Sequence, residues 1–184
     1  DIGSNHGHFS RIATAGGALT VSMDFDPAAV EQNYRLSRQP CEARMLPLVL
    51  DLANPSGGIG WHNQERMSLK DRGPCDLGLA LALVHHLAIG NNVHFARIAD
   101  FFADSCRALI VEFVPKHDSQ VQRLLADRED VFVDYHEEGF VRAFQERFKI
   151  EQQQPISGTQ RTLYLMTRKA ADAEARAGRA SGQG

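Results

Sequence analysis

The 184-residue chain has little of what marks secreted, membrane or nucleic-acid-binding proteins. Its three cysteines, Cys41, Cys75 and Cys106, are far apart and form no C-x-x-C pair, which favours reduced thiols over disulfides or metal ligation. No apolar run reaches the roughly 18 residues of a membrane span, and no signal peptide is visible, so we expect a cytoplasmic protein without a membrane partner. The net charge of −3 provides no broad basic surface for nucleic acid, although a local basic groove is left open.

The chain also lacks the signatures of two common classes of ligand site. It has no G-x-G-x-x-G fingerprint of a dinucleotide-binding loop, which disfavours a nicotinamide dehydrogenase. Four histidines invite a search for metal ligands: His6, His8, His85 and His86. Their spacing matches no recognised metal motif, so no metal site is expected.

What is present begins with the first ten residues, which read as the end of a buried strand, a glycine turn and the first turn of a helix. Gly3 and Gly7 let the backbone turn tightly and approach a ligand closely. A second strand over 18–23 ends in Asp24, roughly 20 residues further on, where an acid can accept hydrogen bonds from two ribose hydroxyls. This order of elements predicts a nucleotide-binding βαβ half.

The chemistry of the loop narrows the choice of nucleotide. Asp1 places a carboxylate at the strand tip, where it would repel a pyrophosphate, and Asn5 stands where a dinucleotide loop has its middle glycine. A carboxylate suits a ligand with a cationic amino-acid end. S-adenosylmethionine (SAM) has adenine, ribose, a sulfonium and an ammonium, and no phosphate.

At these residues the chain resembles a known family. The opening D-I-G-S-N-H-G resembles motif I of the Rossmann-like (class I) SAM-dependent methyltransferases, and V-S-M-D-F-D-P, residues 21–27, resembles motif II. The family usually has glycine where this chain has Asn5, and asparagine tolerates left-handed backbone better than most residues. The resemblance covers about residues 1–168, and the run 51–116 is also similar to a subfamily some of whose members are called nodulation-related methyltransferases. The cofactor-binding residues that the resemblance and the strand ends imply are Asp1, Gly3, Ser4, Asn5, His6, Gly7, Asp24, Phe25, Asp51, Leu52 and Ala82.

Two of these assignments have a plain structural alternative. Asp51 closes a strand where the family contacts adenine, but an acid there can merely cap the turn that follows. Phe25 and Trp61 are candidates for the walls of the adenine site, and each fits an ordinary core position as well.

Strands and helices alternate along the chain, which predicts an α/β fold, a Rossmann-like doubly wound sheet that is mostly parallel. A helix over 8–16 has Phe9, Ile12 and Ala13 on one face, and the strand 45–50 is nearly continuously apolar, as for a strand covered on both faces. Asp26 and Pro27 start a further helix as cap and first-turn proline. The other predicted elements are helices at 62–70, 91–104, 119–127 and 137–147, strands at 76–84 and 108–114, and a C-terminal antiparallel hairpin of 148–152 with 162–167.

Residues 1–168 are expected to form one methyltransferase domain, and 169–184, which contain no large apolar residue, a disordered tail. Only Asp1 and Ile2 of the first strand precede the glycine loop. Since that strand is central in this fold, we expect the domain to be N-terminally incomplete, its first strand truncated and upstream residues completing it.

Ligands of such sheets bind outside the carboxyl ends of the strands, which selects His85, His86 and Glu112 as catalytic candidates. A neutral imidazole there can take a proton from a hydroxyl or amine nucleophile; alternatively one histidine packs and the other bonds the backbone. Glu112 interrupts an apolar strand, so it needs a partner, for which Lys116 or a histidine is a candidate. A structural ion pair and a substrate contact both stay open for this carboxylate.

The sequence therefore predicts a SAM-dependent methyltransferase whose acceptor, a small molecule or RNA, is unidentified. The family's signature for amino methylation of DNA bases, an Asp or Asn before Pro-Pro and an aromatic residue, is absent after the strand 76–84, where L-V-H-H stands instead. Methylation of DNA bases is thereby disfavoured. The alternative is a non-catalytic module of the same fold that binds SAM or a partner.

Overall fold

The computed structural model describes residues 1–38 and 44–170. Cys41 and most of the predicted disordered tail, residues 171–184, lie outside the described residues. The chain divides into two compact units, one made of 1–72 with 79–83 and the other of 73–78 with the residues from 84 onward. The sequence prediction of a single domain over 1–168 stays a prediction, and each unit is described by itself.

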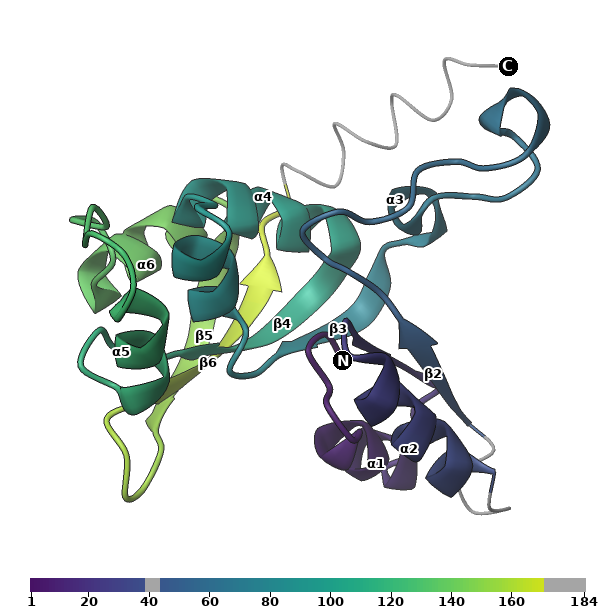
Figure 1. The fold of residues 1–184 in the computed structure, drawn as a ribbon, viewed down its shortest axis with the longest axis horizontal. Coiled ribbons are helices and arrows are strands. Elements are labelled where there is room, and N and C mark those ends of the chain that lie inside the picture. Colours follow the sequence, from purple (N-terminus) through teal and green to yellow (C-terminus); the bar gives the residue numbers. More distant parts are fainter. Residues whose placement is uncertain (39–43, 171–184) are drawn as a thin grey trace. The chain divides into compact units, whose positions relative to one another are not determined.

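The first unit contains a pair of parallel strands, residues 20–24 and 45–49, which are connected through one helix and preceded by another (Figure 1). Ile2 bridges Met23 in parallel, and its amide donates to the carbonyl oxygen of Leu79 (2.9 Å), so the residue before the glycine loop is paired on both sides, as expected for a central strand. The elements of this unit are α1 (His8–Ala15), β1 (Thr20–Asp24), α2 (Pro27–Ser37), β2 (Met45–Val49), a 3₁₀ turn (Trp61–Asn63) and α3 (Leu69–Arg72).

Helix α1 packs on β1 through polar side chains rather than through its apolar stripe. The Ser10 and Ser22 hydroxyls are hydrogen-bonded to each other (2.8 Å), as are the Thr14 and Thr20 hydroxyls (3.0 Å). Phe9 and Ile12, which the sequence groups on one helix face, are exposed. Short hydroxyl side chains let the helix and strand approach closely while each buried hydroxyl keeps a partner.

Strand β2 differs from the prediction of a strand covered on both faces. Met45 and Pro47 are buried, but Leu46, Leu48 and Val49 are exposed. Among the described residues β2 pairs with β1 alone, so it is an edge strand with one covered face.

The predicted helix over 62–70 is wrong. Ile59 and Arg66 form an antiparallel bridge, so residues 59–66 make a tight hairpin, and helix α3 (Leu69–Arg72) overlaps the predicted helix only at residues 69 and 70. His62 and Asn63 at its tip have φ of 56° and 59°, a left-handed conformation that no α-helix continues. The glycines at 58 and 60 close the hairpin; a Cβ on Gly60 would lie 2.2 Å from the Glu65 carboxylate.

The second unit is built on a sheet of strand order β3-β4-β6-β5, part of β3 belonging to each unit. Strand β6 pairs antiparallel with both β4 and β5, which confirms the predicted C-terminal hairpin. Its elements are β3 (Cys75–Ala80), the π-helix η3 (His86–Gly90), α4 (Phe95–Ser105), β4 (Cys106–Phe113), α5 (Ser119–Leu125), α6 (Glu137–Gln145), β5 (Phe148–Pro155) and β6 (Thr162–Arg168).

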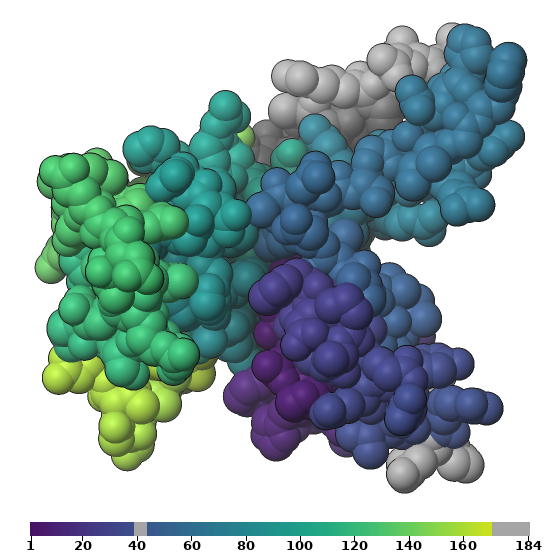
Figure 2. All heavy atoms as spheres, in the orientation of Figure 1, coloured from purple at the N-terminus to yellow at the C-terminus, as the bar shows by residue number. Residues whose placement is uncertain are grey.

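The core of the second unit is rich in aromatic side chains. The helix predicted over 137–147 is present as α6, and its Phe140 and Phe144 are fully buried and lie 4.4 Å apart between ring centroids. Phe102 of α4 and Tyr164 of β6 complete this core, and each such burial contributes about 1.5–3 kcal/mol. Helix α4 packs against α6, and α5 against η3, which gives the continuous teal and green surface of Figure 2.

Candidate functional site

The glycine loop of the first unit uses its own backbone donors. Each amide of residues 3–7 donates to an acceptor in the loop or in β1: Gly3 and Ser4 to the Met23 carbonyl (2.8 and 3.0 Å), Asn5 to the Asp24 carboxylate (2.7 Å), His6 to the Asn5 side chain (2.8 Å) and Gly7 to the Ser4 carbonyl (2.8 Å). A phosphate-binding loop points such amides at its ligand. Here they are satisfied by the protein, so the loop is not prepared for a phosphate.

Three left-handed residues shape this loop. Gly3, Asn5 and Gly7 have φ of 74°, 48° and 77°, so Asn5 takes the backbone conformation in which the family usually has glycine. A Cβ on Gly7 would lie 2.4 Å from Oδ1 of Asn33, whose side chain donates to the Ser22 hydroxyl (2.8 Å). The loop is thereby held close against α2.

Asp24, the predicted ribose acceptor, is buried at the end of β1. Its Oδ2 accepts from the Asn5 amide (2.7 Å) and its Oδ1 from the Asp26 amide (2.9 Å). A carboxylate has about four acceptor sites, so each oxygen retains a lone pair. The same group can close the glycine loop and accept from two ribose hydroxyls.

Two further side chains of the loop region bear on a ligand. The Ser4 hydroxyl is buried and has no hydrogen-bond partner among the described residues. A buried hydroxyl without a partner is costly, and a polar ligand atom would satisfy it. The Asp1 carboxylate accepts from the Ser10 hydroxyl (2.6 Å), which fixes its orientation at the strand tip.

The residues predicted around the adenine are more exposed. Phe25 is 76% exposed, which leaves its ring free of the core and rules out the ordinary core position. Asp51 is exposed, and its Oδ1 accepts from the Ala53 amide (2.9 Å), so it does cap the turn that contains Leu52. Trp61 is 80% exposed at the tip of the hairpin 59–66, so it too is no core residue.

Ala82, predicted at the cofactor site from the strand end, has φ of 48°. A non-glycine residue in this region is strained by about 1–3 kcal/mol, and such strain clusters at functional sites. Its neighbour Leu83 lies against the glycine loop, since a Cβ on Gly3 would lie 3.3 Å from it. All predicted cofactor-binding residues thus belong to the first unit.

The two predicted histidine bases lie in the second unit and differ in environment. His85 is fully buried, and both its ring nitrogens lack a hydrogen-bond partner among the described residues. Burial, followed by the neighbouring His86 and Arg161, lowers the pKa of His85 from 6.5 to about 4, so it is neutral at physiological pH. His86 is exposed, its ring 4.2 Å from that of His85 between centroids, which makes it the more accessible base.

Glu112, the third predicted catalytic residue, has a partner that the sequence did not suggest. Arg161 donates to Glu112 (3.2 Å) and makes a bidentate pair with Asp118 (2.7 and 3.1 Å), all three side chains being largely buried. The guanidinium holds the pKa of Asp118 below its usual range. Lys116, the partner expected from the sequence, instead pairs with Asp130 (2.8 Å). In the chain, Arg161 lies 43 positions from Asp118 and 49 positions from Glu112, so no local sequence pattern reveals these contacts.

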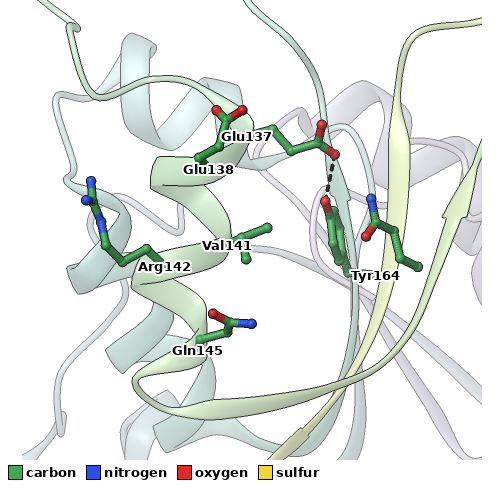
Figure 3. A pocket seen from close by; sticks show the side chains of 7 residues that line it. Glu137, Glu138, Val141, Arg142, Gln145 and Tyr164 are labelled. Carbon is green, nitrogen blue, oxygen red and sulfur yellow. Dashed lines mark hydrogen bonds between the residues drawn. The ribbon is translucent and has the colours of Figure 1, made fainter.

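A pocket of about 310 Å³ lies against α6, where Tyr164 donates to Glu137 (2.6 Å) and where Glu138 and Arg142 also belong to the lining (Figure 3). The buried Tyr164 hydroxyl already has a hydrogen-bond partner, so nothing in this pocket calls for a ligand.

No helix in the described part of the chain is long and apolar enough to cross a membrane, and no group of three metal-ligating side chains occurs there.

Comparison with known proteins gives one sequence relative of note. The chain is 41% identical over 169 residues to the nodulation protein NoeA of Rhizobium meliloti (strain 1021). The match covers 91% of this chain but 35% of that protein, so the chain spans about a third of its relative's length. No family profile matches the chain.

Several solved structures share the fold. The PH0226 protein of Pyrococcus horikoshii OT3 aligns over 92% of this chain and 80% of its own (TM-score 0.61, 12% identity). The bifunctional kinase-methyltransferase WbdD aligns over 91% of this chain and 34% of its own (TM-score 0.58, 15% identity). The mitomycin 7-O-methyltransferase MmcR aligns over 92% and 48% (TM-score 0.56, 14% identity). At these identities the likeness establishes the fold.

Proposed function

We propose that this chain, which has the Rossmann-like fold of the class I SAM-dependent methyltransferases, binds SAM and transfers its methyl group to an acceptor. One observation carries the proposal: the amides of residues 3–7 are satisfied internally, and one of them donates to the acid that ends β1. The loop is therefore lined by carboxylates and has no free amide to offer a phosphate. It suits a nucleoside with a cationic amino-acid end and opposes a pyrophosphate.

The residues of the first unit fit the parts of SAM. Asp24 would accept from the two ribose hydroxyls through the lone pairs that its loop contacts leave. Asp1 would face the ammonium, and the buried Ser4 hydroxyl would gain a polar partner. Phe25 offers an exposed ring to the adenine, and Asp51 offers an exposed carboxylate.

SAM supplies a methyl group on a sulfonium, an activated leaving group, so the protein contributes placement and electrostatics. In-line displacement needs the nucleophile, the methyl carbon and the sulfur aligned, and orientation alone can supply several kcal/mol of rate acceleration. If the acceptor is a hydroxyl or an amine, His86 is the residue best exposed to take its proton. We infer a small-molecule or RNA acceptor, reached in the cytoplasm.

The test is calorimetry with three ligands, SAM, its demethylated product and NAD, followed by incubation with methyl-labelled SAM and fractionated cell extract. We expect SAM and its product to bind, NAD not to bind, and label to enter one acceptor fraction. Binding of NAD with an affinity equal to that of SAM would contradict the proposal that the loop opposes a pyrophosphate.

A second candidate function is a non-catalytic SAM-binding module, and one observation favours it. Two of the three predicted catalytic side chains are engaged within the second unit: His85 is fully buried and Glu112 is ion-paired with Arg161, which is what side chains that support the fold would show. SAM binding without label transfer to any fraction would favour this candidate.

A further inference from the structure

The second unit contains a pocket of about 430 Å³ that the proposed cofactor residues do not use. Two segments form it, 88–95 and 131–135. Most of its lining is apolar or aromatic, and the side chains that matter here are Val93, Phe95, Phe132, Val133 and Tyr135. The volume lies in the range of roughly 300–1,000 Å³ that small-molecule sites occupy.

The wall of this pocket formed by 131–135 is held in place by hydrogen bonds. Lys116 donates to the Phe132 carbonyl (2.9 Å) and pairs with Asp130 (2.8 Å). The Tyr135 hydroxyl donates to the Val114 carbonyl (2.8 Å), and Arg128 donates to the Ile89 carbonyl of η3. Although Val131 and Val133 are 64% and 80% exposed, the backbone that carries them is anchored on residues 114 and 116, just after β4, and on η3. The pocket is therefore pre-formed.

The charge of the lining restricts the ligand. The polar residues that line the pocket are Asn92, His94 and Asp134, and no lysine or arginine is among the lining residues. The cations nearby, Lys116 and Arg128, are engaged by backbone carbonyls. An anionic ligand would find a carboxylate and no countercharge, whereas a neutral or amine-bearing one would find donors and acceptors.

We propose that this pocket binds an uncharged or amine-bearing small molecule through an aromatic or similarly flat apolar group. One side of the pocket begins in the π-helix η3, which carries Ala88 of the pocket wall. Single π-turns of this kind occur frequently at functional sites.

The probe for the experiment is N-phenyl-1-naphthylamine, a neutral dye whose fluorescence rises in apolar sites. Titration into the full chain should saturate at one dye per chain. Val133→Asp, which adds a charge at the pocket, should weaken binding at least fivefold. Val49→Asp is the matched control, since Val49 is an exposed valine of β2 in the other unit and should leave dye binding unchanged.

A second measurement needs no variant. 1-Naphthylamine, which is uncharged near neutral pH, should displace the dye at a concentration at least tenfold lower than 1-naphthoate, which has the same ring system and carries a negative charge. The proposal is overturned if Val133→Asp binds the dye like the wild type, if Val49→Asp weakens it equally, or if the naphthoate competes as well as the amine. SAM calorimetry does not involve this pocket, so dye binding without SAM binding, or the reverse, tells which of the two proposals fails.

Discussion

Gly7 is the residue of the glycine loop at which an added side chain would meet the closest contact. It has φ of 77°, and an added Cβ would lie 2.4 Å from Oδ1 of the buried Asn33. We expect Gly7→Ala to lower the free energy of unfolding by about 2–4 kcal/mol, from backbone strain of about 1–3 kcal/mol and the clash.

Gly17→Ala is the matched control, because Gly17 has φ of 92° but nothing within 4 Å of an added Cβ. Urea unfolding of both variants separates the clash from the strain. Equal losses of stability would mean that Asn33 moves aside without cost.

Asp24 is the residue on which SAM binding should depend most. Asp24→Ala removes a charged acceptor of the ribose hydroxyls and of the Asn5 amide, so the free energy of SAM binding should weaken by about 1.5–3 kcal/mol, roughly tenfold to a hundredfold in Kd. Calorimetry measures this directly.

Asp26→Ala is the control for Asp24→Ala. Asp26 caps α2 by accepting from the Ala28 amide (2.8 Å), so its loss should cost about 1 kcal/mol of stability and leave SAM affinity within a few-fold. Unchanged affinity in Asp24→Ala would remove Asp24 from the cofactor site.

His85 should make stability depend on pH. Its pKa is about 4 when folded and 6.5 ordinarily, so between these values the unfolded chain binds the extra proton. The contribution of the neutral His85 to the free energy of unfolding is fully present above about pH 6.5. As the pH falls toward 4, up to roughly 3 kcal/mol of this free energy is lost.

Chemical denaturation from pH 7.5 to 4.5 checks this behaviour of His85. His85→Gln should flatten the fall in stability, while His86→Gln, which removes the second cause of the lowered His85 pKa but leaves the burial in place, should keep most of it. A wild-type profile that matches that of His85→Gln would contradict the buried neutral state.

At the scale of elements, Arg161 joins the turn before β6 to the N-terminus of α5 and to β4. Asp118, its bidentate partner, also caps α5 by accepting from the Gln120 amide (2.9 Å). Because the ion pairs are largely buried, Arg161→Met should cost about 3 kcal/mol of stability.

Arg107→Met is the comparison for Arg161→Met. Arg107 pairs with Asp76 at 2.6 Å, but both side chains are exposed, so the expected cost is below about 1 kcal/mol. Thermal melting of the two variants ranks them, and similar shifts would mean that the Arg161 network stabilises no more than a surface pair.

At the scale of the whole molecule, local stability should differ between the units. Strand β4 lies between β3 and β6 and has a fully buried face, whereas β2 is an edge strand with exposed Leu46 and Leu48. Amide hydrogen exchange should therefore be at least roughly tenfold slower in β4 than in β2. Equal protection of the two strands would mean that the chain opens as one cooperative unit.

The sequence by itself determined the features that depend on near neighbours. Asp26 and Pro27 start α2 as predicted, because capping and proline geometry act within one turn. Helix α6 and the C-terminal hairpin follow from periodicity. The same holds for the glycine loop, whose left-handed residues at 3, 5 and 7 follow from glycine and asparagine.

Only the tertiary structure decided which distant groups meet. A polar face attaches α1 to β1 because Ser22 and Thr20 offer partners there, although helical periodicity marks the opposite stripe. The hairpin 59–66 replaces a predicted helix because its tip residues adopt left-handed backbone. Arg161 reaches Asp118 and Glu112 across more than forty residues, and the pocket of the second unit joins two segments about as far apart. Packing free energy, which is summed over the whole fold, selects such pairs, and it leaves no trace in local spacing.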